Sequence, residues 1–457
     1  MTLTEKILAR AAGKTRVQAG DNVWVNADVL MTHDVCGPGT IGVFKREFGK
    51  TAKVWDRQRV VIIPDHYIFT ADSNSNRNVN ILRDFSKEQG LPYFYDVIDD
   101  PNGTWKFDPG QGLLKKQYGS TYAGVCHTAL PAKGHTRPGE ILFGTDSHTC
   151  MAGAFNQFAT GIGNTDAGFV MGTGKLLIKV PETMRFRLEG KLQRGVMAKD
   201  IILHCIGEIG FDGATYRAMQ FDGSGVRSLS IDDRMTIANM AIEAGGKNAI
   251  FEFDARTQEY VDARVKLNGT KSSYEPVEPD REQKFIYELV VDLDKLEPTV
   301  ACHPDPGQRK KAKDMDLKLD RAYIGSCTGG KTSDFVEFAQ VLRGKRVSID
   351  TFGVPATPDI VRDLQSTRWG DKTIWQILLE AGVRMTENAG CAACLGGPVD
   401  TFGRINQPGL KCISATNRNF PGRMGDKESQ VFLASPATVA ASAITGRITD
   451  PREYLAN

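Results

Sequence analysis

Short apolar runs along this chain end in polar loops, and helix-like patterns follow them. The clearest runs cover residues 59–63, 140–143 and 321–324, and each is rich in Val, Ile, Phe or Tyr. This alternation is typical of βα units, which build a parallel sheet covered by helices. Residues 1–11 follow an amphipathic helix pattern. The pattern therefore predicts an α/β fold.

Loop-like segments divide the chain into three parts. Residues 181–190 and 268–280 are loop-like, and residues 296–298 close the middle part. We therefore predict domains at residues 1–182, 183–297 and 298–457. A chain of 457 residues is long enough for three domains, since one domain takes about 150 residues.

Composition and charge exclude several classes of protein. Apolar residues make up 41% and the net charge is +2, so disorder and a nucleic-acid or membrane-surface partner are not expected. No apolar run approaches the roughly 18 residues that cross a bilayer, and no signal peptide is visible. Nine thinly spread cysteines favour a reducing compartment over a disulfide framework.

Glycine is enriched in one stretch. Residues 144–174 contain seven glycines, which is too many for a bulky core segment. Glycine lets the backbone come close to another group because it has no Cβ. We expect a close backbone approach in this stretch.

Residues able to do chemistry follow each of the three apolar runs. Asp65 and His66 follow the first, Asp146 and His148 follow the second, and Cys327 follows the third. Open α/β sheets bind ligands at the carboxyl ends of their strands. This coincidence predicts a functional site at those strand ends.

Three cysteines could form one metal site. Cys391 and Cys394 form a lone Cys-x-x-Cys pair, which is weak evidence by itself. Together with Cys327 they offer three thiolates with small neighbours, and three sulfurs suit an iron–sulfur cluster with one iron lacking a protein ligand. The alternative is three buried, inert thiols.

A second motif points to a different class of enzyme. Residues 325–332 match G-x-x-x-x-G-K-[ST], a phosphate-binding loop, between an expected strand and a helix capped near Thr332. The apolar run before Asp65 resembles a Walker B strand but precedes the loop. A P-loop NTPase therefore stays open as an alternative. A third possibility, RNA binding, is disfavoured by the balanced charge.

Three histidines are candidates for acid–base chemistry. His66 stands beside Asp65, His148 stands near Asp146, and His127 supplies a third imidazole. A carboxylate fixes the tautomer of a histidine and raises its affinity for a proton, as general acid–base catalysis requires. The alternative is that these are solvated or capping histidines.

Four further polar residues stand out. Asn239 and Glu243 lie four positions apart, so on a helix they would share one face among apolar neighbours. Arg418 and Arg423 flank a Pro-Gly turn. Two converging guanidinium groups would suit a dicarboxylate, because each matches a carboxylate bidentately. The alternative for Asn239 and Glu243 is an ordinary exposed pair, and the alternative for the two arginines is surface salt bridges.

Five motifs together resemble the aconitase superfamily, in particular the plant-type large subunits of isopropylmalate isomerases (3-isopropylmalate dehydratases). They occur in the family's order and cover most of the chain, at residues 64–66, 144–149, 324–330, 391–398 and 417–423. The resemblance implies three α/β/α-type domains of the aconitase iron–sulfur core around a central cleft, without the swivelling fourth domain.

The resemblance also implies roles for individual residues. A [4Fe-4S] cluster, one per subunit, is held by three cysteines: Cys327, Cys391 and Cys394. His66, paired with Asp65, protonates the leaving oxygen. Two further imidazole–carboxylate pairs are His127 with Asp146 and His148 with Glu243. The other residues that match positions of the family contact the cluster or the substrate: His33, Ser147, Asn239, Arg418 and Arg423.

The implied reaction is a hydro-lyase reaction. It dehydrates 2-isopropylmalate to an alkenoate and rehydrates that to 3-isopropylmalate, in leucine biosynthesis. Homoaconitase, dimethylmalate and methylthioalkylmalate dehydratases are alternatives. Because the chain stops at Asn457, we expect a separate small subunit to supply the swivelling domain and its serine base, without which the chain turns over little. The expected location is a bacterial cytoplasm or the plastid stroma.

Overall fold

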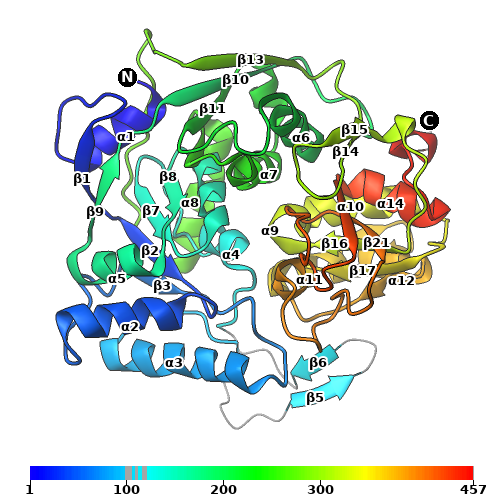
Figure 1. Cartoon of the computed structure of the whole chain (residues 1–457), viewed down its shortest axis with the longest axis horizontal. Coiled ribbons are helices and arrows are strands. Elements are labelled where there is room, and N and C mark those ends of the chain that lie inside the picture. Colours follow the sequence, from blue (N-terminus) through cyan, green and yellow to red (C-terminus); the bar gives the residue numbers. More distant parts are fainter. Residues whose placement is uncertain (98–104, 109–111, 116–120, 456–457) are drawn as a thin grey trace.

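The computed structural model describes residues 1–97, 105–108, 112–115 and 121–455. Three sheets built largely from parallel strands form three lobes, coloured blue to cyan, green, and yellow to red in Figure 1. The expected α/β class is confirmed. Among the described residues, no helix is both long and apolar enough to span a membrane.

The first sheet is wholly parallel, in the order β4-β3-β2-β7-β8. Its strands are β2 (Val29–Thr32), β3 (Val60–Ile62), β4 (Tyr93–Phe94), β7 (Ile141–Gly144) and β8 (Phe158–Gly161). Its helices are α1 (Leu3–Ala11), α2 (Gly37–Phe48), α3 (Ser73–Gln89), α4 (Cys126–Ala132), the 3-10 helix η1 (Ser147–Phe155) and α5 (Asn164–Thr173). Two antiparallel ribbons accompany it, β1 (Asn22–Asn26) with β9 (Lys175–Lys179) and β5 (Trp105–Asp108) with β6 (Gly112–Lys115).

The second sheet is also parallel, in the order β12-β11-β10-β13. Its strands are β10 (Thr183–Glu189), β11 (Ala218–Asp222), β12 (Asn248–Phe251) and β13 (Tyr287–Asp292). Its helices are α6 (Ala198–Ile209), η2 (Ser224–Ser228), α7 (Ile231–Asn239), η3 (Met240–Ala244) and α8 (Ala255–Asn268). Asn239 is the last residue of α7, and Glu243 lies in the 3-10 helix η3 that follows it directly.

The third sheet has the order β15-β14-β22-β21-β16-β17-β20, and only the pairings made by β14 are antiparallel. Its strands are β14 (Thr299–Ala301), β15 (Arg309–Lys311), β16 (Arg321–Gly325), β17 (Asp350–Val354), β20 (Arg384–Met385), β21 (Lys411–Ser414) and β22 (Gln430–Ala434). Around it lie η4 (Ala312–Asp314), α9 (Ser326–Gly329), α10 (Thr332–Leu342), α11 (Pro358–Ser366), the ribbon of β18 (Arg368–Trp369) and β19 (Lys372–Thr373), α12 (Ile374–Glu380), α13 (Ala392–Leu395), α14 (Pro436–Thr445) and η5 (Pro451–Glu453).

One apolar core joins the second and third lobes and reaches into the first. It runs through the second and third sheets and includes Phe155 of η1, which belongs to the first lobe. Apolar burial of this kind is the main stabilising contribution to a fold. The domain boundaries near residues 182 and 297 stay a prediction, although no described strand crosses either residue.

The glycine-rich stretch packs backbone against backbone, as expected. A Cβ placed on Gly153 would lie 1.6 Å from the carbonyl oxygen of Ala249 in β12. Only glycine fits there, because no Cβ approaches another heavy atom so closely. The stretch therefore lets η1 lie directly against the second sheet, and η1 begins with two of the predicted site residues.

Candidate functional site

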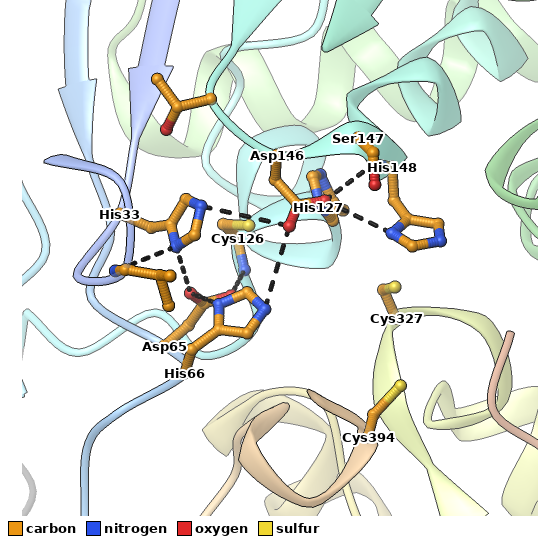
Figure 2. Close-up of polar contacts among 12 residues, drawn as sticks. His33, Asp65, His66, Cys126, His127, Asp146, Ser147, His148, Cys327 and Cys394 are labelled. Atoms are coloured by element: carbon orange, nitrogen blue, oxygen red, sulfur yellow. Dashed lines mark hydrogen bonds and ion pairs between the residues drawn. The ribbon is translucent and has the colours of Figure 1, made fainter. Parts of the chain in front are cut away.

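Three neighbouring strands of the first sheet deliver polar side chains to one edge. His33 follows β2, Asp65 and His66 follow β3, and Asp146 follows β7. Because β3, β2 and β7 are adjacent and parallel, their carboxyl ends lie side by side. Figure 2 shows these side chains gathered opposite Cys327 and Cys394.

Asp65 and His66 form a tight buried pair. His66 Nδ1 lies 2.6 Å from Asp65 Oδ1, and the other carboxylate oxygen accepts the backbone N–H of Cys126 at 2.7 Å. Burial is the largest single influence and lowers the pKa of His66, but the contact with Asp65 and the charges of Asp146 and Asp34 together raise the pKa to about 10. The imidazole is therefore protonated at neutral pH.

Asp34 is a buried residue that sequence reasoning missed. Its Oδ1 accepts the backbone N–H groups of Asp65 at 2.9 Å and His66 at 3.1 Å, and its Oδ2 accepts that of Tyr67. Three consecutive amides therefore converge on one carboxylate. The available signal was its position directly after His33, at the end of the central strand β2.

Asp146 joins two further imidazoles. Its Oδ1 lies 2.7 Å from His127 Nε2 and accepts the backbone N–H of His148 at 2.8 Å. His148 Nε2 lies 2.7 Å from Glu243 Oε1. Burial and the charge of Arg418 lower the pKa of His148, yet hydrogen bonds with the two carboxylates raise it to about 9. The structure thus places both expected imidazole–carboxylate pairs in hydrogen-bonding contact.

His33 and His66 face the second oxygen of Asp146. His33 Nε2 lies 4.0 Å and His66 Nε2 lies 3.9 Å from Asp146 Oδ2. These separations exceed a hydrogen bond and leave room for a bridging oxygen atom. Within the described residues, His33 Nε2 is buried without a hydrogen-bond partner. The arrangement can therefore receive a polar atom of a ligand.

The two arginines differ in their surroundings. Arg418 Nε donates to both Glu243 oxygens at 2.8 and 3.0 Å, and its terminal nitrogen donates to Ser147 Oγ at 2.9 Å. Arg418 therefore supplies the counter-charge that the buried Glu243 carboxylate needs, and substrate binding by the two arginines stays a prediction. Arg423 is half-buried, and its Nε has no hydrogen-bond partner among the described side chains and backbone.

The three predicted cysteines meet below the histidines. Cys327 lies in α9, Cys391 precedes α13 and Cys394 lies within it, and all three are buried. The Cys391 thiol hydrogen-bonds to the other two sulfurs, which lowers the pKa of Cys394 to about 6 and that of Cys327 well below its ordinary value. The same contacts raise the pKa of Cys391 well above its ordinary value, so the Cys391 thiol lies between two more acidic cysteine sulfurs.

Two amides contact these sulfurs. Asn239 Nδ2 donates to Cys327 Sγ at 3.2 Å, and Asn417 Nδ2 approaches the same sulfur at 3.4 Å. Thr328 Oγ1 donates to Asn239 Oδ1 at 2.6 Å and thereby orients its amide. Asn417 is a second residue that was not singled out, although it opens the 417–423 motif.

The phosphate-loop motif has a different role. Lys331 is buried, and its ammonium group contacts Thr236 Oγ1 at 2.8 Å, the carbonyl oxygen of Thr328 at 2.6 Å and Asp334 at 2.7 Å. These partners occupy the donors that a nucleotide-binding lysine needs for phosphate. The geometry argues against a P-loop NTPase.

Comparison with known proteins identifies the family. The family model described as "Aconitase family (aconitate hydratase)" matches residues 5–316 and 307–446. The chain belongs to the aconitase family. Membership in that family implies an iron–sulfur cluster. The three converging cysteine sulfurs are compatible with such a cofactor.

Two relatives match this aconitase-family chain over its whole length. The chloroplastic 3-isopropylmalate dehydratase large subunit of Arabidopsis thaliana is 55% identical over 100% of the chain and 87% of the relative. The 3-isopropylmalate dehydratase large subunit 1 of Methanopyrus kandleri is 42% identical over 99% of each chain. The crystal structure of Thermococcus kodakaraensis aconitase X (holo-form) is 12% identical with a TM-score of 0.45, over 86% and 84% of the two chains.

Proposed function

We propose that this chain is the cluster-binding large subunit of a 3-isopropylmalate dehydratase, a hydro-lyase of leucine biosynthesis. It would interconvert 2- and 3-isopropylmalate by dehydration and rehydration. The observation that carries the proposal is that buried cysteines of the third lobe lie opposite the imidazole–carboxylate pairs of the first lobe, as Figure 2 shows for Cys327 and Cys394. The names of the full-length relatives support the choice of substrate.

The donor set fits a [4Fe-4S] cluster held by Cys327, Cys391 and Cys394. Cysteine thiolates are the ligands such clusters require, and amide donors to sulfur, such as Asn239 to Cys327, are a common way to stabilise their charge. When bound, the cluster supplies a Lewis acid that polarises the C–O bond of the substrate.

His66 is proposed as the general acid. Its Nδ1 is engaged by Asp65, so the proton available to the leaving hydroxyl is on Nε2. Hydroxide that takes this proton leaves as water, while the proton on the neighbouring carbon goes to the base. A pKa of about 10 keeps the His66 imidazole protonated at neutral pH.

Substrate binding is assigned to the polar groups around this acid. Arg423 Nε and His33 Nε2 are buried and without partners among the described residues, so each can take an oxygen of a dicarboxylate hydroxy acid. Arg418 acts through Glu243 and Ser147, which it holds in place. Asn239 supports the Cys327 sulfur.

A separate small subunit is proposed as partner. The relatives are named large subunits, and the proposed reaction still needs a base for the carbon-bound proton. The partner would supply a serine base on a swivelling domain and exclude water from the site. We place the complex in a bacterial cytoplasm or a plastid stroma, the latter by analogy with the chloroplastic relative.

Co-expression with a candidate small subunit tests the function. After anaerobic cluster reconstitution, alkenoate formation is followed with 2- and 3-isopropylmalate, homocitrate, citrate and dimethylmalate. We expect turnover of the isopropylmalates by the complex and little or none by this chain alone. Absence of turnover with every substrate, with cluster and partner both present, refutes the proposed activity.

Cysteine variants test the cluster separately. Cys327→Ser should abolish the brown absorption near about 400 nm that thiolate-bound clusters give. Cys205→Ser is the matched control, because Cys205 is equally buried but lies in α6 within the second lobe. Equal iron and sulfide content in both variants contradicts the ligand assignment.

A further inference from the structure

Tyr323 has a buried hydroxyl group that lacks a partner. The residue lies in β16 with no exposed surface, and within the described part of the chain its hydroxyl oxygen makes no hydrogen bond. Buried polar groups are nearly always paired in native proteins, so each exception needs an explanation. A buried tyrosine hydroxyl normally finds a partner at the polar end of its ring.

The Tyr323 side chain lies beside the cysteine segment. Tyr323 lines a cavity of about 30 Å³ together with Gly390, Ala392 and Ala393, which surround Cys391 in sequence. A Cβ on Gly403 would lie 2.8 Å from the ring, so this glycine lets the chain pack against it. This close packing restricts movement of the ring.

A glycine also leaves space at the hydroxyl. A Cβ on Gly325 would lie 3.0 Å from the Tyr323 hydroxyl oxygen and 2.8 Å from the carbonyl oxygen of Val354. Burial raises the pKa of Tyr323 well above its ordinary value, and the nearby charges of Cys391 and Cys394 raise it further. The hydroxyl therefore keeps its proton and is available as a donor.

We infer that the Tyr323 hydroxyl donates a hydrogen bond to a sulfur of the bound cluster on its Cys391–Cys394 side. Tyr323 is then a positioning residue that stabilises negative charge on sulfur, and it does not touch the substrate. Hydrogen bonds to the sulfurs help set the reduction potential of such clusters. The inference rests on the proposed cluster-binding function.

Tyr323→Phe removes only the hydroxyl and tests the inference. In the reconstituted two-subunit complex, the midpoint potential of the cluster is measured by redox titration followed by electron paramagnetic resonance. We expect a shift to a more negative potential and loss of one exchangeable proton coupling to the reduced cluster. Tyr95→Phe is the control, because the Tyr95 hydroxyl bonds to His135 Nε2 at 2.7 Å in the first lobe. The midpoint potential of the cluster in this control should match that of the wild type.

A stability measurement separates this role from a structural one. The cluster-free Tyr323→Phe chain should resist denaturant at least as well as the wild type, because the change removes an unpaired buried hydroxyl. An unchanged potential and proton coupling overturn the inference, for example if a water in the cavity satisfies the phenol. Because this test needs a bound cluster, its failure is distinct from failure of the proposed function, in which no cluster assembles.

Discussion

Replacing Asp34 by asparagine tests whether this carboxylate holds the loop that carries His66. Asp34 is fully buried and accepts the backbone N–H groups of Asp65, His66 and Tyr67. Asparagine has the same shape but only one acceptor oxygen. If that oxygen keeps the first two amides, the new NH2 group faces the Tyr67 N–H, and two donors oppose each other.

The expected cost follows from the lost contacts. A hydrogen bond to a charged group contributes about 1.5–3 kcal/mol, and an unsatisfied buried donor costs about 1–3 kcal/mol. Relaxation of the loop recovers part of this, so we expect the free energy of unfolding to fall by about 2–4 kcal/mol. Since His66 moves with the loop, kcat of the complex should fall with little change in KM, and a displacement of about 1 Å can cost about 100-fold.

Three measurements check this prediction. Denaturant unfolding gives the loss of stability, steady-state kinetics separate kcat from KM, and hydrogen exchange reports the backbone amides of residues 65–67. Asp72→Asn is the matched control, because Asp72 caps α3 by accepting the Ser75 N–H at 2.7 Å and asparagine caps equally well. Unchanged stability and unchanged exchange in Asp34→Asn would refute the positioning role.

Two further substitutions probe the acid and the packing beside it. In Asp65→Asn, the partner that raises the pKa of His66 to about 10 is lost, so the alkaline limb of the kcat–pH profile should move toward neutral pH. Because the pKa of His66 is raised, protonated His66 stabilises the fold fully below its ordinary pKa of about 6.5, and this stabilisation is lost as the pH rises through about 10. In denaturant titrations, Asp65→Asn should weaken this dependence of stability on pH. Gly153→Ala should destabilise the chain by several kcal/mol in thermal unfolding, since its Cβ would lie 1.6 Å from Ala249 O, whereas Gly42→Ala, with nothing within 4 Å, should be neutral or stabilising.

The strands that carry site residues were predictable where apolar runs end in polar loops. The runs at residues 59–63 and 140–143 became β3 and β7, and the run at 321–324 became β16. The order of the strands was not predictable, because it depends on contacts between distant segments. The central strand β2 was not singled out, and Asp34 at its end was therefore missed.

Pairing between distant residues was equally inaccessible to spacing arguments. His148 meets Glu243 across 95 positions, and only the family resemblance linked them. The Lys331 motif shows the opposite error, since a matching pattern says nothing about where a side chain points. Its ammonium group turns inward to Thr236 and Asp334 because a buried charge needs nearby partners.

Asp65 links the two halves of the site through different atoms of one residue. Its side chain holds His66 Nδ1 at 2.6 Å, while its carbonyl oxygen accepts the backbone N–H of Cys391 at 3.1 Å. A shift of the Cys391 loop therefore pulls on the backbone that carries the acid. Because the two segments belong to different sheets, the distance between acid and sulfur ligands is fixed by this direct contact rather than by the packing of the lobes alone. Substitutions in the cysteine loop should consequently alter catalysis by His66 even where they leave the sulfurs in place.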